Sequence, residues 1–71
     1  MMIFAQKTTK NGIKVTLFFE DGYFFVKAES SIAERLSNKC VTKANAMKVF
    51  DLWLSRWENV DIQDEVNFYE L

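Results

Sequence analysis

The sequence predicts a small α+β domain in which a three-stranded antiparallel meander precedes a long amphipathic helix. Three observations support this prediction. Both glycines of the chain stand in turn dipeptides, Asn11-Gly12 and Asp21-Gly22, which favour the type I′ turns of hairpins. The segments around them are rich in β-branched and aromatic residues, as strands are. Residues 43–59 then repeat apolar side chains with the period of a helix.

The meander is expected to comprise residues 3–9, 13–20 and 23–29. A two-residue turn between the second and third strands places Glu20 opposite Tyr23. Because side chains alternate between the two faces of a sheet, the same pairing continues to Lys14 opposite Glu29. One face of this hairpin is then wholly apolar and is predicted to be the core face, with Ile13, Val15, Leu17, Phe19, Phe24, Val26 and Ala28.

The first hairpin allows two registers, and a shift of one residue moves every side chain to the other face. A two-residue loop would place Phe4 on the core face. A three-residue loop over 10–12, with Gly12 in the bulge position, would place Ile3 and Ala5 there and Phe4 on the opposite face. We prefer the three-residue loop because it buries Ile3 and Ala5 together.

The rest of the chain is expected to contain a short helix, the long helix and a final segment. The run from Ser31 to Glu34 matches a capping box, which predicts a short helix over 32–37. Residues 39–42 form a loop or a short edge strand, and Thr42 is a good N-cap for the helix over 43–59. That helix is predicted to bury Ala46, Met47, Phe50, Trp53, Leu54 and Trp57. Residues 60–71 are expected to form a short helix, which we prefer near 61–66, or a strand.

The bulk properties indicate one domain, 1–71, in a reducing compartment. A chain of 71 residues buries only about 60% of its unfolded surface, so a dense core or self-association is needed. The single Cys40 cannot form an intramolecular disulfide, and a lone thiol fits a cytoplasmic protein. There is no signal peptide pattern, and no apolar run approaches the roughly 18 residues of a membrane span.

The inventory of reactive groups predicts that the protein is not an enzyme. The chain has no His, which is the usual acid–base group near neutral pH. Cys40 therefore has no imidazole to activate it, and we expect it to be a small buried hydrophobe. Neither glycine belongs to a phosphate-binding loop. We accordingly predict no catalytic residue, no cofactor and no metal site.

The second face of the sheet is the most informative feature for function. Phe18, Tyr23 and Phe25 share this face, and Phe4 joins them if the first loop has three residues. Exposed apolar clusters of this kind are rarely without a role on a monomer. Either the C-terminal segment covers it, or it is a protein interface, or aromatic side chains stack nucleic-acid bases while Lys7, Lys14 and Lys27 contact phosphates.

Charge favours a protein partner over nucleic acid. The net charge is −1, whereas proteins that follow a nucleic-acid backbone normally carry a clear positive excess. Residues 1–43 carry +3 and residues 44–71 carry −4, so an acidic half could oppose a basic site on a partner. We therefore predict a non-catalytic interaction module that is a homodimer or an accessory or inhibitory subunit, and that uses Phe18, Tyr23, Phe25 and Phe4.

Overall fold

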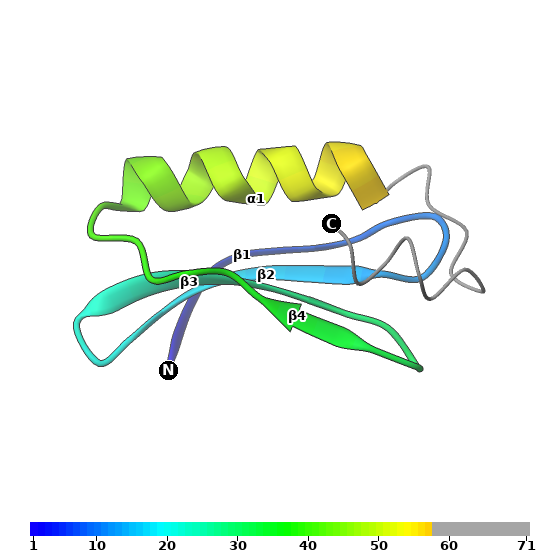
Figure 1. Cartoon of the computed structure of the whole chain (residues 1–71), viewed down its shortest axis with the longest axis horizontal. Coiled ribbons are helices and arrows are strands. Elements are labelled where there is room, and N and C mark those ends of the chain that lie inside the picture. The colour runs from blue at the N-terminus through cyan, green and yellow to red at the C-terminus, as the bar shows by residue number, and fades with distance from the viewer. Residues whose placement is uncertain (58–71) are drawn as a thin grey trace.

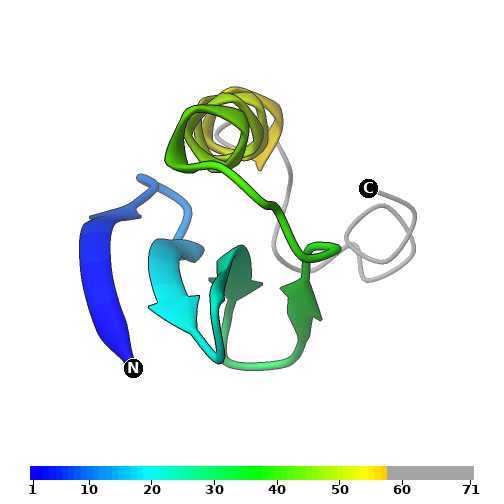
Figure 2. The same ribbon diagram turned by 90° about the vertical axis from the view of Figure 1, so that its left-hand side faces the viewer.

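In the described part of the chain, a four-stranded antiparallel sheet carries one helix on one of its faces (Figures 1 and 2). The computed structural model describes residues 1–57, so the segment predicted over 60–71 lies outside the described residues. The strand order β1-β2-β3-β4 follows the chain, which confirms the meander. The helix after the strands confirms the long helix and the α+β class. The elements are β1 (Met2–Thr8), β2 (Lys14–Glu20), β3 (Tyr23–Glu29), β4 (Glu34–Leu36) and α1 (Lys43–Trp57).

The β2–β3 hairpin has the register that its turn dipeptide predicts. The pairing runs without interruption from Glu20 opposite Tyr23 to Lys14 opposite Glu29. At the turn, Asp21 has φ 53° and Gly22 has φ 85°, and a type I′ turn requires positive φ at both of these positions. The predicted division into two faces is therefore confirmed for this hairpin. Of the residues assigned to the core face, Phe24 lies only at the border of the buried core and Phe19 is not part of it.

The β1–β2 hairpin has the three-residue loop that we preferred. The Thr9 amide donates to the Ile13 carbonyl at 2.8 Å, and the Gly12 amide donates to the Thr9 carbonyl at 3.0 Å. Gly12 has φ 92°, which a residue with a side chain rarely adopts. Ala5 consequently faces Leu17, on the core face as predicted.

A β-bulge at Phe4 makes the prediction wrong for the first part of β1. Ile3 pairs with Phe18 and Ala5 pairs with Leu17, so Phe4 is an extra residue with no partner of its own on β2. The Phe4 ring lies 5.6 Å from the Phe24 ring, on the side of the sheet that faces α1. The extra residue reverses the alternation, so Ile3 lies on the outer side and Phe4 does not.

The short helix predicted over 32–37 is also wrong, because strand β4 occupies this part of the chain. Ser30, and not Ser31, supplies the turn: its hydroxyl accepts from the amides of Ile32 and Ala33, both at 3.2 Å. The Ser30 amide donates to the Ala33 carbonyl at 2.8 Å. The capping-box pattern is purely local, whereas the free edge of β3 offers residues 34–36 a row of backbone partners.

The chain continues to pair with β3 beyond β4. Ser37 donates its amide to the Val26 carbonyl at 2.8 Å, and its hydroxyl accepts from the Val26 amide at 2.9 Å. Cys40 and Phe24 then exchange two backbone hydrogen bonds of 2.8 and 2.9 Å. Of the two alternatives for residues 39–42, an edge-strand contact therefore occurs at Cys40.

Helix α1 covers the sheet over β2 and β3 (Figure 2). The Thr42 hydroxyl accepts from the Asn45 amide at 3.2 Å, which confirms the predicted N-cap. At the other end, the Asn11 side chain donates to the Trp57 carbonyl at 2.9 Å and ties the helix to the β1–β2 loop. The core comprises Ile13, Val15, Leu17, Val26, Ala28, Ala46, Phe50, Trp53 and Trp57, with Met47 and Leu54 packed at its border.

Candidate functional site

The face of the sheet opposite α1, called here the outer face, has no other described element on it (Figure 2). Its members follow from the pairing of the four strands, since residues opposite one another share a face. Most polar members lie toward the β1–β2 loop and the aromatic members toward the Asp21-Gly22 turn, where Glu20 is the polar exception. From β1 to β4 they are Ile3, Gln6, Thr8, Lys14, Thr16, Phe18, Glu20, Tyr23, Phe25, Lys27, Glu29, Glu34 and Leu36.

An apolar strip crosses all four strands of the outer face. Ile3 faces Phe18, and Phe18 stacks on Phe25 with ring centroids 5.5 Å apart. Leu36 faces Lys27 and is thus the diagonal neighbour of Phe25. Phe18 is only 6% exposed, whereas Ile3 and Leu36 are 52% and 55% exposed. These four residues, Ile3, Phe18, Phe25 and Leu36, are the outer strip.

Two of the predicted site residues lie away from the centre of this strip. Tyr23 is on the outer face at the turn, and the Lys39 ammonium lies over its ring, 4.5 Å from the centroid. Phe4 is on the helix side, where it contacts Phe24 and where the Lys43 ammonium lies 4.8 Å from its ring centroid. The structure thus brings Phe18 and Phe25 together, places Tyr23 at the border and separates Phe4 from all three.

Ile3 and Leu36 are members that sequence reasoning missed. Ile3 lies on the outer face because of the bulge at Phe4. The sequence of β1 contains no residue, such as glycine, that would predict a bulge. Leu36 belongs to a strand of three residues, which is too short for an alternating pattern to emerge. The adjacent serines at 30 and 31 were the available signal for a turn, since serine hydroxyls commonly close turns on nearby amides.

The polar end of the outer face is organised around one carboxylate. Glu29 contacts the Lys14 ammonium at 3.8 Å and the Lys27 ammonium at 4.0 Å. The Gln6 side chain donates to the Thr16 hydroxyl at 3.0 Å. A hollow of about 190 Å³ lies between this polar group and the outer strip. All of these ion pairs are partly exposed, so each contributes little stability.

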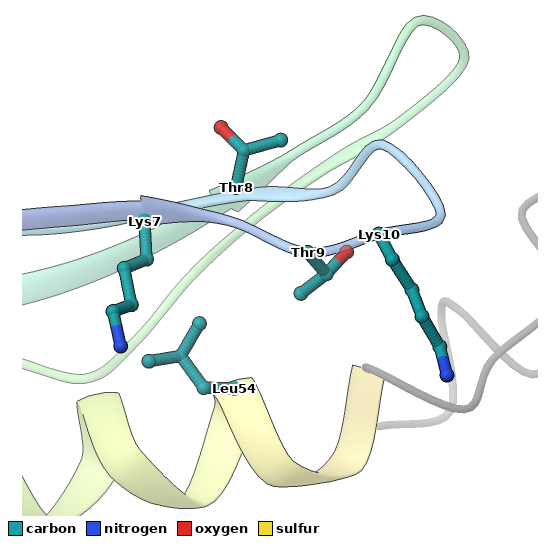
Figure 3. A pocket seen from close by; sticks show the side chains of 5 residues that line it. All are labelled: Lys7, Thr8, Thr9, Lys10 and Leu54. Atoms are coloured by element: carbon teal, nitrogen blue, oxygen red, sulfur yellow. The ribbon is translucent and has the colours of Figure 1, made fainter.

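The three lysines considered for nucleic acid do not form one surface. Lys14 and Lys27 share Glu29 on the outer face. Lys7 faces Val15 and is therefore on the helix side. There it lines a separate hollow of about 310 Å³ between β1 and α1, together with Thr8, Thr9, Lys10 and Leu54 (Figure 3).

The Cys40 thiol and the acidic side chains of the described residues form no further site. Cys40 is half-buried, packs against the core and donates its thiol to the Asn38 carbonyl at 3.6 Å. Within residues 1–57, no three His, Cys, Asp or Glu side chains gather as they would around a metal ion. Nor does this described part of the chain hold a helix of the length and apolarity that crossing a membrane requires.

Comparison with known proteins identifies no relative of this chain. No family model, no curated protein and no solved structure matches the chain.

Proposed function

We propose that the protein is a non-catalytic interaction module that binds another protein surface through its outer strip. It acts as one half of a homodimer or as an accessory or inhibitory subunit. The observation that supports this most directly is that an apolar strip extends across the whole sheet on a face where no described element packs. Exposed apolar patches that are rimmed by polar residues commonly mark interaction sites.

The arrangement of the outer face also has the anatomy of an interface. Two stacked aromatic rings, Phe18 and Phe25, lie at its centre, and aromatic residues are enriched at the centres of protein interfaces. Charged groups lie around them, with Glu29 and its two lysines on one side and Glu20 on the other. A partner would therefore cover mainly Ile3, Phe25 and Leu36, since only 6% of Phe18 is exposed.

Replacing the accessible part of the strip tests this proposal. The variant Phe25→Ser with Leu36→Ser removes two apolar side chains from β3 and β4 but leaves Phe18, which is nearly buried. Hot-spot residues, which cluster near the centre of an interface, cost about 2 kcal/mol or more when truncated, and Phe25 lies at the centre of the strip. We therefore expect self-association, measured by sedimentation over a wide range of concentrations, to weaken about tenfold or more.

Leu52→Ser is the matched control, because Leu52 is exposed to a similar extent, 49% against 55% for Leu36, but lies on α1. We expect it to leave association unchanged. Far-UV circular dichroism shows whether each variant is folded. If the double variant unfolds, the single variant Leu36→Ser is used for the association measurement instead. Association that survives both outer-strip variants while they stay folded would exclude the outer strip as the contact, and a wild-type monomer at every concentration would exclude the homodimer.

Nucleic acid is the alternative occupant of the outer face, and one observation favours it. The stacked rings of Phe18 and Phe25 share the outer face with Lys14 and Lys27, and aromatic rings on a sheet can stack bases. The separation of Lys7 from Lys14 and Lys27 counts against it. Titration with single-stranded and duplex nucleic acid at low salt decides, because backbone binding is strongest there. We expect no binding.

A further inference from the structure

The two edges of the sheet differ in how well they are protected. β4 is three residues long and includes the charged Glu34 and Arg35, and short charged strands discourage pairing with another chain. β1 is the other edge. It is seven residues long with Lys7 as its only charge, and no described element lies beyond it (Figure 2). The bulge at Phe4 bends the start of β1, so the regularly paired stretch from Ala5 to Thr8 is the open edge of the sheet.

The backbone groups that β1 offers at this edge follow from its pairing with β2. The Thr9 amide bonds to Ile13, which fixes that position as a hydrogen-bonded pair. Antiparallel pairs alternate between hydrogen-bonded and non-hydrogen-bonded, so Lys7 and Ala5 bond to β2 as well. Gln6 and Thr8 then direct their amides and carbonyls away from β2, toward the open edge.

The helix side of β1 carries a projection at its start and a hollow at its end. Met2, which pairs with Phe19, is 59% exposed, and Phe4 is 40% exposed. At the other end lies the hollow of about 310 Å³ beside Leu54. Figure 3 shows the Lys7 and Lys10 side chains extending toward α1 on either side of Leu54, while Thr8 points away.

We propose that a second copy of this chain pairs with β1 in antiparallel fashion, with Gln6 opposite Gln6 of the second copy. A two-fold axis at Gln6 brings the start of each β1 to the end of the other. The exposed Met2 and Phe4 of one copy then lie beside the hollow of the other. Projection and hollow lie on the same side of one strand, so the surface is complementary to itself, as an isologous dimer requires.

Charge selects this register over its neighbour. An axis at Lys7 would place two lysines directly opposite each other, which is destabilising. The axis at Gln6 instead places Lys7 opposite Ala5 of the second copy, near the exposed Phe4 ring.

The inference goes beyond the proposed function because it assigns self-association to the backbone of β1 and its helix side. The outer strip then binds a different protein, as an accessory subunit would, and a homodimer through the outer strip is the competing alternative. The result is a closed dimer with one continuous sheet of eight strands, four from each copy. Both helices lie on the same side of that sheet, and the two outer faces join into one surface that stays open to a further partner.

Engineered cysteines test the register directly. In a Cys40→Ala background, Gln6→Cys places two thiols on residues that face each other at about 5.5 Å between Cα atoms, within the range that a disulfide spans. Thr8→Cys is the matched control, because the two copies of residue 8 would lie about 14 Å apart along the strands. We expect mild oxidation to cross-link the Gln6→Cys protein, and not the Thr8→Cys protein, on non-reducing gels.

Blocking the edge provides an independent measurement. Gln6→Pro removes an amide that points away from β2 and so spares the ladder within the chain, while Gln6→Ala removes the same side chain but keeps the amide. We expect the Pro variant to sediment as the 8.4 kDa monomer and the Ala variant to associate like wild type. If Gln6→Pro unfolds, the cysteine pair decides.

Three results would overturn the inference. They are a wild-type monomer at every concentration, cross-linking of Thr8→Cys as readily as Gln6→Cys, and a dimer that persists in folded Gln6→Pro. If that persistent dimer dissociates with Phe25→Ser and Leu36→Ser, the contact is the outer strip, so the proposed function stands and the edge pairing fails. If only Gln6→Pro dissociates the dimer, the edge pairing stands and the outer-strip homodimer fails, while binding of a different protein by the outer strip is still to be tested.

Discussion

Ser30 and Ser31 are adjacent in the sequence but differ in what their hydroxyls do. The Ser30 hydroxyl accepts from two backbone amides and donates to the Ala33 carbonyl at 3.4 Å, whereas Ser31 is exposed. We expect Ser30→Ala to lower the free energy of unfolding by about 1 kcal/mol, and Ser31→Ala to change it by less than about 0.5 kcal/mol. Urea unfolding measures both. The reverse order would indicate the helix cap at Ser31 that the sequence pattern favours.

Helix α1 shows at the scale of an element how one face determines stability. Phe50 is 5% exposed and packs in the core, while Leu52, two residues on, is 49% exposed. We expect Phe50→Ala to cost about 3–5 kcal/mol because it leaves a cavity, which is a large part of the roughly 5–15 kcal/mol that a domain has. Leu52→Ala should change stability by less than about 0.5 kcal/mol. Thermal or urea unfolding measures the free energy of unfolding of both variants. Similar losses of stability in the two would contradict the orientation of α1.

Amide hydrogen exchange reports on the whole molecule. In a single copy, the amides of Ala5 and Lys7 bond to β2 and should exchange slowly, while those of Gln6 and Thr8 face the open edge and should exchange fast. Pairing of two copies along β1 adds protection at Gln6 and Thr8. We therefore expect exchange at these two amides, followed by NMR, to slow as protein concentration rises. Fast exchange there in a sample that sedimentation shows to be dimeric would place the contact elsewhere.

The parts of the fold that sequence patterns predicted correctly are those determined by neighbours along the chain. The Asp21-Gly22 turn has two residues, so it fixes every pair of the β2–β3 hairpin. The spacing of Phe50, Trp53 and Trp57 fixes the buried face of α1 in the same way. Both rest on one local period, and neither depends on where distant segments pack.

The features that failed depend on contacts between distant segments. Phe4 leaves the outer face because its ring packs against Phe24, twenty residues away in sequence. Residues 34–36 form a strand because β3 offers them an edge. The same limit applies to the candidate site: Phe18 and Phe25 follow from a local turn and were correctly placed on the outer face, whereas Ile3 and Leu36 were not found.

The bulge at Phe4 also determines which mutations the first strand tolerates. Ile3 and Ala5 already pair with the consecutive residues Phe18 and Leu17. A deletion of codon 4 would therefore leave every other pairing of β1 in place and remove only the ring that lies against Phe24. A deletion at residue 6 would instead shift everything before it relative to β2 and exchange the two faces. Residue 4 is thus a position of β1 where a deletion leaves the strand pairing unchanged.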